Sequence, residues 1–269
     1  MIVSGLVFSV FTKPWKTQPI ENLAERLKQL GFDGIEFPLR DGYQVEPANA
    51  GRDLPAMTHR LSGLGIQVTS VAANLQEPIF EACALAGVPM IRIMANFSLA
   101  NGYLAGESAV RQTLDKAVPW SIQYGVKIGI QHHYGTGVSN SMELQHLISG
   151  FDPQQVGAIW DAAHSALAGE DPEQGLQILW PWLCMVNLKN ACYRQAGSAP
   201  GGETRWERYF TTGDQGLSSW RQASATLTAM QYQGTICLTA EYSDEDLVDV
   251  LIARDIAYAR SLFTGRQPE

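Results

Sequence analysis

The sequence predicts an α/β fold of one domain, a (β/α)8 barrel over residues 1–269, and three observations support this prediction. The length suits one such domain, because a core of that size buries most of its apolar surface without disulfides or metal ions. Short runs rich in Val and Ile alternate with longer amphipathic stretches, which is typical of repeated βα units around a parallel sheet. Eight such runs are present. Eight units close most naturally as a barrel, and an open doubly wound sheet is the alternative.

The predicted strands are joined by turns that repeat one pattern. In LGFDGIEF, LGIQVTSV, AGVPMIRI and YGVKIGIQ a glycine stands where a helix ends, and a buried strand follows. Before the first of these glycines, Gly31, apolar residues fall at helical spacing from Ile20 to Leu30. The predicted strands are Ile2–Ser9, Gly34–Phe37, Gln67–Ala72, Met90–Met94, Lys127–His132, Val156–Asp161, Met185–Lys189 and Thr235–Glu241.

Two segments are too long to be simple connections, namely 40–55 and 191–216. Long structured loops in a compact domain are usually lids or substrate contacts. In a barrel these two follow the second and seventh strands, on the catalytic face. We expect the second loop to cover the site partly, with Arg205 holding a ligand phosphate or carboxylate and Trp206 stacking on the ligand.

Composition and charge limit the partners. A net charge of −8 disfavours a nucleic-acid partner, because Lys and Arg supply most of the affinity for phosphates. No apolar run reaches the ~20 residues of a membrane span, and the first residues lack the basic region of a signal peptide. The four cysteines have no CxxC spacing and are expected to be reduced. We therefore expect a cytoplasmic protein that binds a small molecule, with a homo-oligomer left open.

Polar and ionisable side chains interrupt the predicted strands near their carboxyl ends. A charge there is costly unless it is paired or functional, and in a barrel all strand ends of this kind meet at one mouth. Two readings stay open for Glu36 and Arg92, which either form an internal ion pair or contact the ligand. His132 is interpreted as packed in the interior. The full set is Glu36, Asn74, Arg92, Gln131, His132, His133, Asp161, His164, Asn187, Lys189, Asn190 and Glu241.

These residues carry a resemblance to a known family. EF after the second strand, QHH after the fifth, DxxH after the sixth, LKNA after the seventh, a GDQG segment and a final AEYSD follow one another along nearly the whole chain. In this order the sequence resembles the xylose isomerase-like TIM barrel family, which contains sugar and sugar-phosphate isomerases, epimerases and related dehydratases and shares its barrel with family 2 endonucleases of abasic DNA. The resemblance implies a carbohydrate-like small-molecule substrate.

The resemblance also implies a divalent metal held by Glu, Asp, His and Glu on strands five to eight. The matching positions here are Gln131, Asp161, Asn187 and Glu241, so two of the four depart from the family. Amide oxygens also coordinate hard cations, but the site loses one negative charge and the imidazole that suits zinc. If a metal binds, we expect Mg or Mn rather than Zn, and weak binding.

The departure at Gln131 changes the expected chemistry. An amide does not accept a proton from carbon, so Gln131 is not the second base of a two-faced epimerisation. Glu241 is the remaining base, and one base suffices for an aldose–ketose isomerisation through an enediol or for an elimination. Lys189, His133 or His164 then stabilises the oxyanion or shuttles a proton. By resemblance His133 and His164 contact substrate hydroxyls, and Glu36 and Arg92 are substrate-binding candidates, with Arg92 facing an anionic group.

Three classes of function follow. An isomerase, epimerase or lyase is favoured by Asp161, His164, Lys189 and Glu241, all retained. A non-catalytic carbohydrate-binding protein is favoured by the changes at Gln131 and Asn187. An endonuclease acting at abasic sites is disfavoured by the acidic charge and by the shortage of histidines at ligand positions.

Overall fold

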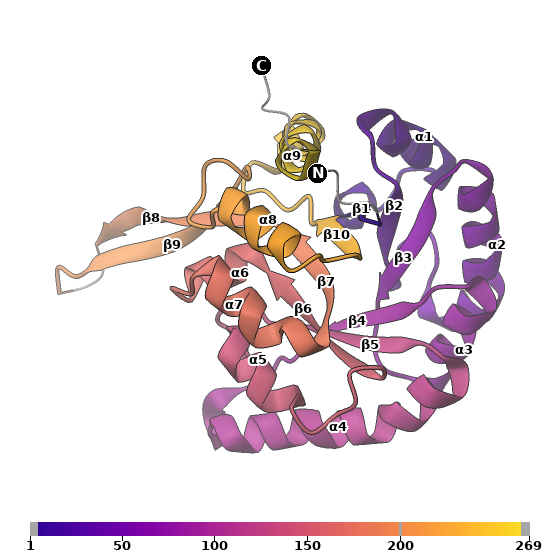
Figure 1. Cartoon of the computed structure of the whole chain (residues 1–269), viewed down its shortest axis with the longest axis horizontal. Coiled ribbons are helices and arrows are strands. Elements are labelled where there is room, and N and C mark those ends of the chain that lie inside the picture. Colours follow the sequence, from indigo (N-terminus) through magenta and orange to yellow (C-terminus); the bar gives the residue numbers. More distant parts are fainter. Residues whose placement is uncertain (1–4, 199–200, 265–269) are drawn as a thin grey trace.

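The computed structural model describes residues 5–198 and 201–264, and within them the predicted barrel is confirmed. Its parallel strands pair in the closed order β1-β10-β7-β6-β5-β4-β3-β2, and the helices surround them as an outer layer (Figure 1). The barrel strands are β1 (Val7–Phe11), β2 (Gly34–Pro38), β3 (Gln67–Ala72), β4 (Met90–Met94), β5 (Lys127–Gln131), β6 (Val156–Asp161), β7 (Leu183–Leu188) and β10 (Thr235–Leu238). The α-helices are α1 (Ile20–Leu30), α2 (Ala50–Gly63), α3 (Glu77–Ala86), α4 (Tyr103–Tyr124), α5 (Ser141–Ile148), α6 (Ala162–Leu167), α7 (Pro172–Leu179), α8 (Trp220–Ala229) and α9 (Val248–Thr264).

Differences from the predicted strands fall at the strand ends. Strands β3, β4 and β6 have the predicted bounds. The first strand begins at Val7, because Gly5, with a φ of 104°, makes a turn before it; residues 2–4 of the predicted strand lie outside the described residues. The last strand stops at Leu238, before the predicted end at Glu241, because Ala240 has a left-handed φ of 51° that a strand does not accommodate.

The repeated glycine turns explain how the helices α1, α2, α3 and α4 return to the barrel. Gly31 ends α1 with a φ of 93°, a backbone conformation that costs an L-residue energy but glycine almost none. The same left-handed glycine stands in the turns before β3, β4 and β5, at Gly65, Gly87 and Gly125.

The interior of the barrel is apolar below its polar mouth. One buried cluster combines side chains from six different strands, which meet only inside the barrel. It consists of Phe11, Ala72, Met90, Ile159, Met185 and Cys237. The polar strand-end residues pack against this apolar cluster.

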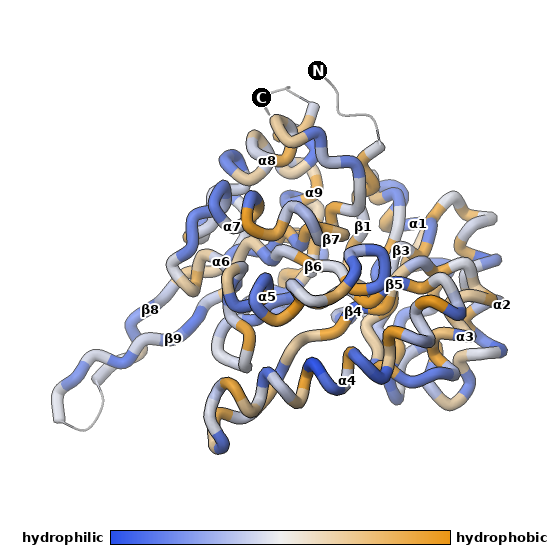
Figure 2. The backbone as a smooth tube through the Cα atoms, turned by 60° about the horizontal axis from the view of Figure 1, so that its bottom comes forward, coloured by the Kyte–Doolittle hydropathy of each residue, from blue (hydrophilic) through white to orange (hydrophobic). Residues whose placement is uncertain are grey.

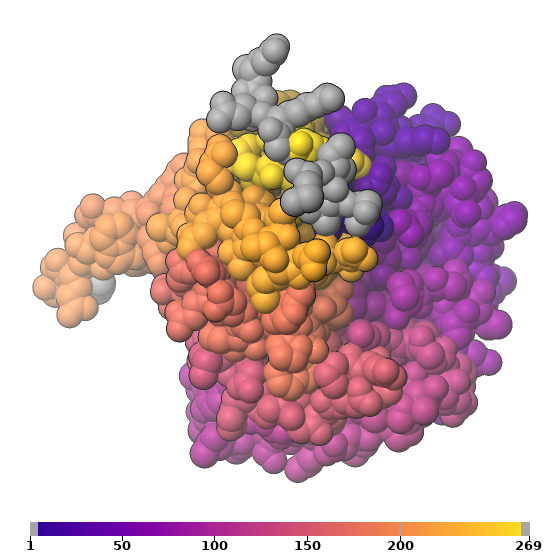
Figure 3. All heavy atoms as spheres, viewed as in Figure 1, coloured from indigo at the N-terminus to yellow at the C-terminus, as the bar shows by residue number. Residues whose placement is uncertain are grey.

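The predicted long loop 191–216 is instead built around a β-hairpin. Its strands β8 (Asn190–Ser198) and β9 (Thr204–Thr211) pair antiparallel and extend from the barrel as an arm (Figures 1 and 3). The arm is largely hydrophilic (Figure 2), and most of its side chains are exposed on both faces, so the alternating apolar pattern of a strand is missing from its sequence. The other predicted loop, 40–55, contains a 3-10 turn at Pro47–Asn49 and the first residues of α2.

Among the described residues, no helix combines the length and apolar character that crossing a lipid bilayer requires.

Candidate active site

A chain of hydrogen bonds crosses the mouth of the barrel and links four strands. Arg92 on β4 donates from Nε to Glu36 Oε1 on β2 (2.5 Å) and from Nη1 to Gln131 Oε1 on β5 (2.7 Å). Gln131 Nε2 in turn donates to Asp161 Oδ2 on β6 (2.7 Å). All four side chains are buried. The structure therefore brings these predicted site residues together. Glu36 and Arg92 form an internal ion pair, which is one of the two roles that the sequence left open for them.

Asp161 also organises the segment that follows it. Its Oδ1 accepts from the backbone N–H of His164 (3.0 Å) and so caps the N-terminus of α6. The backbone N–H of Asp161 donates to His132 Nε2 (3.1 Å), which makes Nδ1 the protonated nitrogen of that ring. Burial lowers the pKa of His132 to about 4. His132 is thus a neutral, packed side chain that fixes the end of β6.

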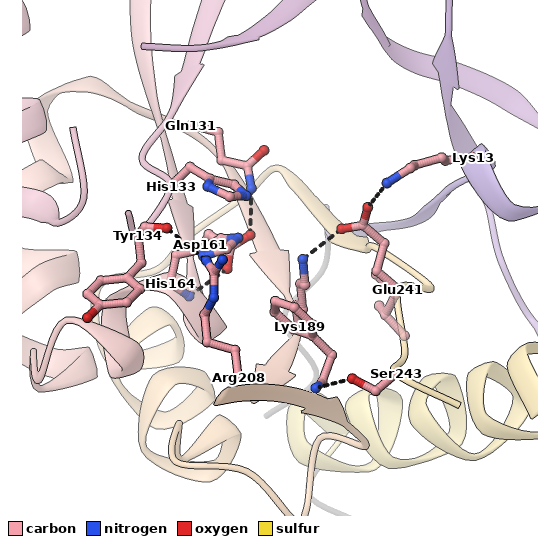
Figure 4. A network of polar contacts seen from close by, with 12 residues as sticks. Lys13, Gln131, His133, Tyr134, Asp161, His164, Lys189, Arg208, Glu241 and Ser243 are labelled. Atoms are coloured by element: carbon pink, nitrogen blue, oxygen red, sulfur yellow. Dashed lines mark hydrogen bonds and ion pairs between the residues drawn. The ribbon is translucent and has the colours of Figure 1, made fainter. Parts of the chain in front are cut away.

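Glu241 lies between two ammonium groups. Lys13 Nζ is 2.5 Å from its Oε1 and Lys189 Nζ is 2.7 Å from its Oε2, and Figure 4 shows the two lysines approaching the carboxylate from different sides. Burial acts to raise the pKa of Glu241, but the two lysines hold it well below the ordinary value. The carboxylate is therefore ionised at neutral pH, and its side chain keeps 27% exposure.

His133 and His164 pack against each other beside this group. Their ring centroids are 3.8 Å apart, and His164 is fully buried with no hydrogen-bond partner for either ring nitrogen among the described residues. Burial, and next to it the charge of Lys189, lower the pKa of both rings. Both imidazoles are therefore neutral at physiological pH. Because Nδ1 of His133 lies 3.1 Å from the Thr136 hydroxyl, Nε2 is the ring nitrogen left for a ligand.

Two adjoining cavities open beside His133 and Glu241, which line both of them. The larger, of about 680 Å³, is lined by Lys13, His133, Lys189, Arg208, Phe210 and Glu241 among others. A smaller one of about 110 Å³ reaches deeper, to Gln131 and Arg92, and shares Lys13, His133 and Glu241 with the first. The larger volume is in the range of small-molecule sites.

Six predicted site residues line neither cavity. Four of them are fully buried, namely Glu36, Asp161, His164 and Asn187, and the other two lie on the arm. Arg205 and Trp206 lie on β9 of the arm, where both are exposed, Trp206 to 59%, and neither lines either cavity. The base of the same arm supplies Arg208 and Phe210 instead.

The sequence reasoning missed Lys13 and Arg208. Lys13 follows Thr12 just beyond the end of β1, and it was missed because the predicted first strand ended at Ser9, four residues earlier. Arg208 had no comparable signal, because it stands in a strand outside the barrel.

The four expected metal ligands do not fit a divalent cation as they stand. A guanidinium only donates, so the Gln131 amide oxygen faces Arg92 and its NH2 group faces Asp161. Both oxygens of Glu241 accept from lysines. Asn187 is fully buried, and its amide has no partner among the described residues. In the part of the chain that the structure describes, no three His, Cys, Asp or Glu side chains are grouped to hold a metal ion.

Fold and site together define a (β/α)8 barrel protein with an ionised carboxylate, two ammonium groups and a neutral imidazole around one cavity at the carboxyl ends of its strands. Residues 24–262 match the family model described as xylose isomerase-like TIM barrel, and the chain belongs to that family.

Comparison with known proteins adds named relatives. The chain is 28% identical to an inosose dehydratase of Bacillus licheniformis over 258 residues, which cover 86% of this chain and 84% of that protein. It is 40% identical to an inosose dehydratase of Mesomycoplasma hyopneumoniae over 160 residues, and this match spans about half of that relative's length, 53%. The crystal structure of 3-keto-D-glucoside 4-epimerase from E. coli superposes with a TM-score of 0.71 at 15% identity, over 95% of this chain and 99% of that one. This last likeness shows the shared fold.

Proposed function

We propose that this chain catalyses proton transfer at a carbon next to a carbonyl group, as a sugar or sugar-phosphate isomerase or epimerase-like enzyme acting on a small polyhydroxy compound. The observation that supports this most is the Glu241 carboxylate, ionised and bonded to Lys189 at the edge of a cavity that His133 also lines. A base next to a fixed cation is the arrangement that enolisation requires.

The chemistry follows from these groups. Glu241 takes the proton from the carbon, the C–H electron pair forms the C–C double bond, and the carbonyl electrons move to oxygen, giving an enediolate. The Lys189 ammonium stabilises that oxyanion. The negative charge that develops on that oxygen offsets part of the Lys189 charge, so the Glu241 carboxylate becomes more basic as the proton is taken, while both lysines stay bonded to it. The hydroxyl proton of the second carbon passes to the first oxygen, and protonated Glu241 returns its proton to the carbon that carried the carbonyl group, so that the carbonyl now stands on the second carbon. The single base therefore accounts for a one-faced isomerisation.

A dehydratase is the second candidate, supported by the relatives that are inosose dehydratases. The first step is the same. The electron pair of the enediolate then expels a hydroxyl group from the adjacent carbon, and that group takes the proton that Glu241 received in the first step and leaves as water. His133 lies in the cavity as a group able to carry this proton.

The shared first step gives one test for both candidates. The protein is incubated in D2O with a panel of ketoses, aldose phosphates and keto-inositols, and NMR follows loss of the C–H signal next to the carbonyl. We expect exchange with at least one compound, and the product spectrum then separates isomer from dehydrated product. Glu241→Gln should abolish the exchange, whereas Glu25→Gln, an exposed change on α1, should not. Binding of a sugar without any exchange would instead establish the non-catalytic carbohydrate-binding class.

We also propose a cytoplasmic location and a homo-oligomer. All four cysteines are free, which supports a reducing compartment. The projecting arm presents the exposed rings of Tyr193 and Trp206, and exposed aromatic side chains are typical of protein contacts. Light scattering on the purified protein, and on Trp206→Asp, measures the oligomeric state.

A further inference from the structure

The negative charges at the barrel mouth are balanced without any added ion. Three carboxylates stand there, and Glu36 is paired with Arg92 while Glu241 is paired with Lys13 and Lys189. Counting Asp161, three carboxylates lie among four positive side chains, because Arg208 also lines the larger cavity. Divalent cations are held by an excess of anionic oxygen ligands, and here no excess remains.

Two of these cations are hydrogen-bonded to residues of the expected ligand set. The guanidinium of Arg92 is bonded to the oxygen of Gln131, and the ammonium of Lys189 to an oxygen of Glu241. A metal ion bound by Gln131 and Glu241 would lie next to both positive groups. Like charges at such distances repel strongly in a partly buried site.

Lys189 is held in place by more than its ion pair. Its side chain is only 5% exposed, and Nζ lies 4.2 Å from the centre of the Phe210 ring, within the range of a cation–π contact. The same side chain lines the larger cavity beside His133. An ammonium has three N–H groups, so donors remain for a ligand oxygen after the bond to Glu241.

We infer that Lys189 takes the electrostatic place of the divalent cation in this chain, so that the site works without a metal and the oxyanion of the substrate binds to the Lys189 ammonium. The claim that the substrate oxyanion binds to Lys189 rests on the proposed function. The claim that the site works without a metal does not, because it concerns only the charges and hydrogen-bond donors of the site without substrate.

Metal titration tests the second claim directly. MgCl2, MnCl2 or ZnCl2 is titrated by calorimetry into the full-length protein after treatment with EDTA, and melting curves are recorded with and without each ion. We expect no saturable binding below about 1 mM and no shift in melting temperature. One equivalent of Mn or Zn bound at micromolar concentration, and lost in Glu241→Gln, would overturn the inference.

Variants distinguish the effect of the two missing ligands on metal affinity from the effect of the Lys189 charge. Gln131→Glu with Asn187→His restores the family's donors but keeps Lys189, so we expect little gain in Mn affinity. Adding Lys189→Met should raise the affinity about tenfold or more over the double variant. The matched control adds Lys189→Arg, which keeps the charge and should gain nothing. Equal Mn binding in all three variants, each with native circular dichroism, contradicts a role of Lys189 as the competing cation.

Activity distinguishes this inference from the proposed function. An active protein that keeps its rate in EDTA, and loses it in Lys189→Met, supports both. A protein that EDTA inactivates and Mn restores overturns the inference while the proposed function stands. If no compound is turned over, the proposed function fails and with it the oxyanion role, whereas the titration still decides the question of the metal.

Discussion

Nε of Arg92 lies 2.5 Å from Oε1 of Glu36, and both side chains are buried, with 6% and 0% exposure. The same guanidinium bonds Gln131, which bonds Asp161. One ion pair therefore orients the polar chain across the barrel mouth. This arrangement explains why two charged residues occur in strands that otherwise bury apolar side chains.

The ion pair predicts that the costs of substituting its two members are not additive. Glu36→Gln leaves the Arg92 charge buried without its carboxylate, and the free energy of unfolding should fall by about 3–5 kcal/mol. Arg92→Met should cost a similar amount, and the double variant clearly less than the two together, because neither charge is then stranded. Urea unfolding of the four proteins measures this. Additive losses would show that the two groups do not depend on each other.

At His164, stability and activity are expected to oppose each other. Its ring is fully buried and both ring nitrogens lack a partner in the described part of the chain, which is unfavourable for stability. Asp161 bonds the backbone N–H of His164 rather than the ring, so the helix cap survives a side-chain change. His164→Leu should raise the free energy of unfolding by about 1 kcal/mol and lower turnover. A destabilised variant with unchanged turnover would assign the ring to packing.

The predictable part of the site is the part that the barrel strands carry. Gln131 and Asp161 end strands whose bounds follow from apolar runs and glycine turns, and the fold itself brings such ends together. The pairing of Glu241 was not predictable in this way. Its partner Lys13 is 228 residues distant in the sequence. Although β1 and β10 are neighbours in the barrel, the predicted first strand ended four residues before Lys13.

The arm shows a second limit of the sequence. Residues 191–216 lack an apolar face because the hairpin is exposed on both sides, so periodicity gave no strand. Length alone predicted a covering loop. The structure divides that segment into a base at the cavity and an exposed outer part.

This division predicts different effects for two residues of β9. Arg208 lines the cavity and donates to the backbone oxygen of Tyr134 (3.1 Å), so Arg208→Ala should raise KM about tenfold or more through lost substrate contacts. Trp206→Ala, in the exposed outer part, should leave KM and kcat within about twofold. Steady-state kinetics on the compound found by deuterium exchange provides the comparison. A large rise in KM for Trp206→Ala alone would restore the covering loop that the sequence predicts.

Asp255 on α9 predicts a pH dependence of stability. Its Oδ1 accepts from Gly213 N–H (2.9 Å) and its Oδ2 from the Tyr242 hydroxyl (2.7 Å), so it ties the end of the arm to the residue after Glu241. Burial raises the pKa of Asp255 to about 6, against these two hydrogen bonds and Arg254, which lower it, while Asp214 raises it further.

The sign follows from where the proton is bound. Between pH 3.8, the ordinary value, and about 6, the folded protein holds the proton of Asp255 while the unfolded chain releases it. The contribution of this group to stability is therefore full below that window and is lost as pH rises through it, by about 3 kcal/mol at most. Asp255→Asn cannot ionise, so relative to the wild type it should become progressively more stable from pH 4 to pH 7. Urea unfolding of both proteins across this range gives the difference directly, with Asp246→Asn, an exposed change, as the control. A difference that stays constant with pH would mean that Asp255 titrates alike in the folded and unfolded chains.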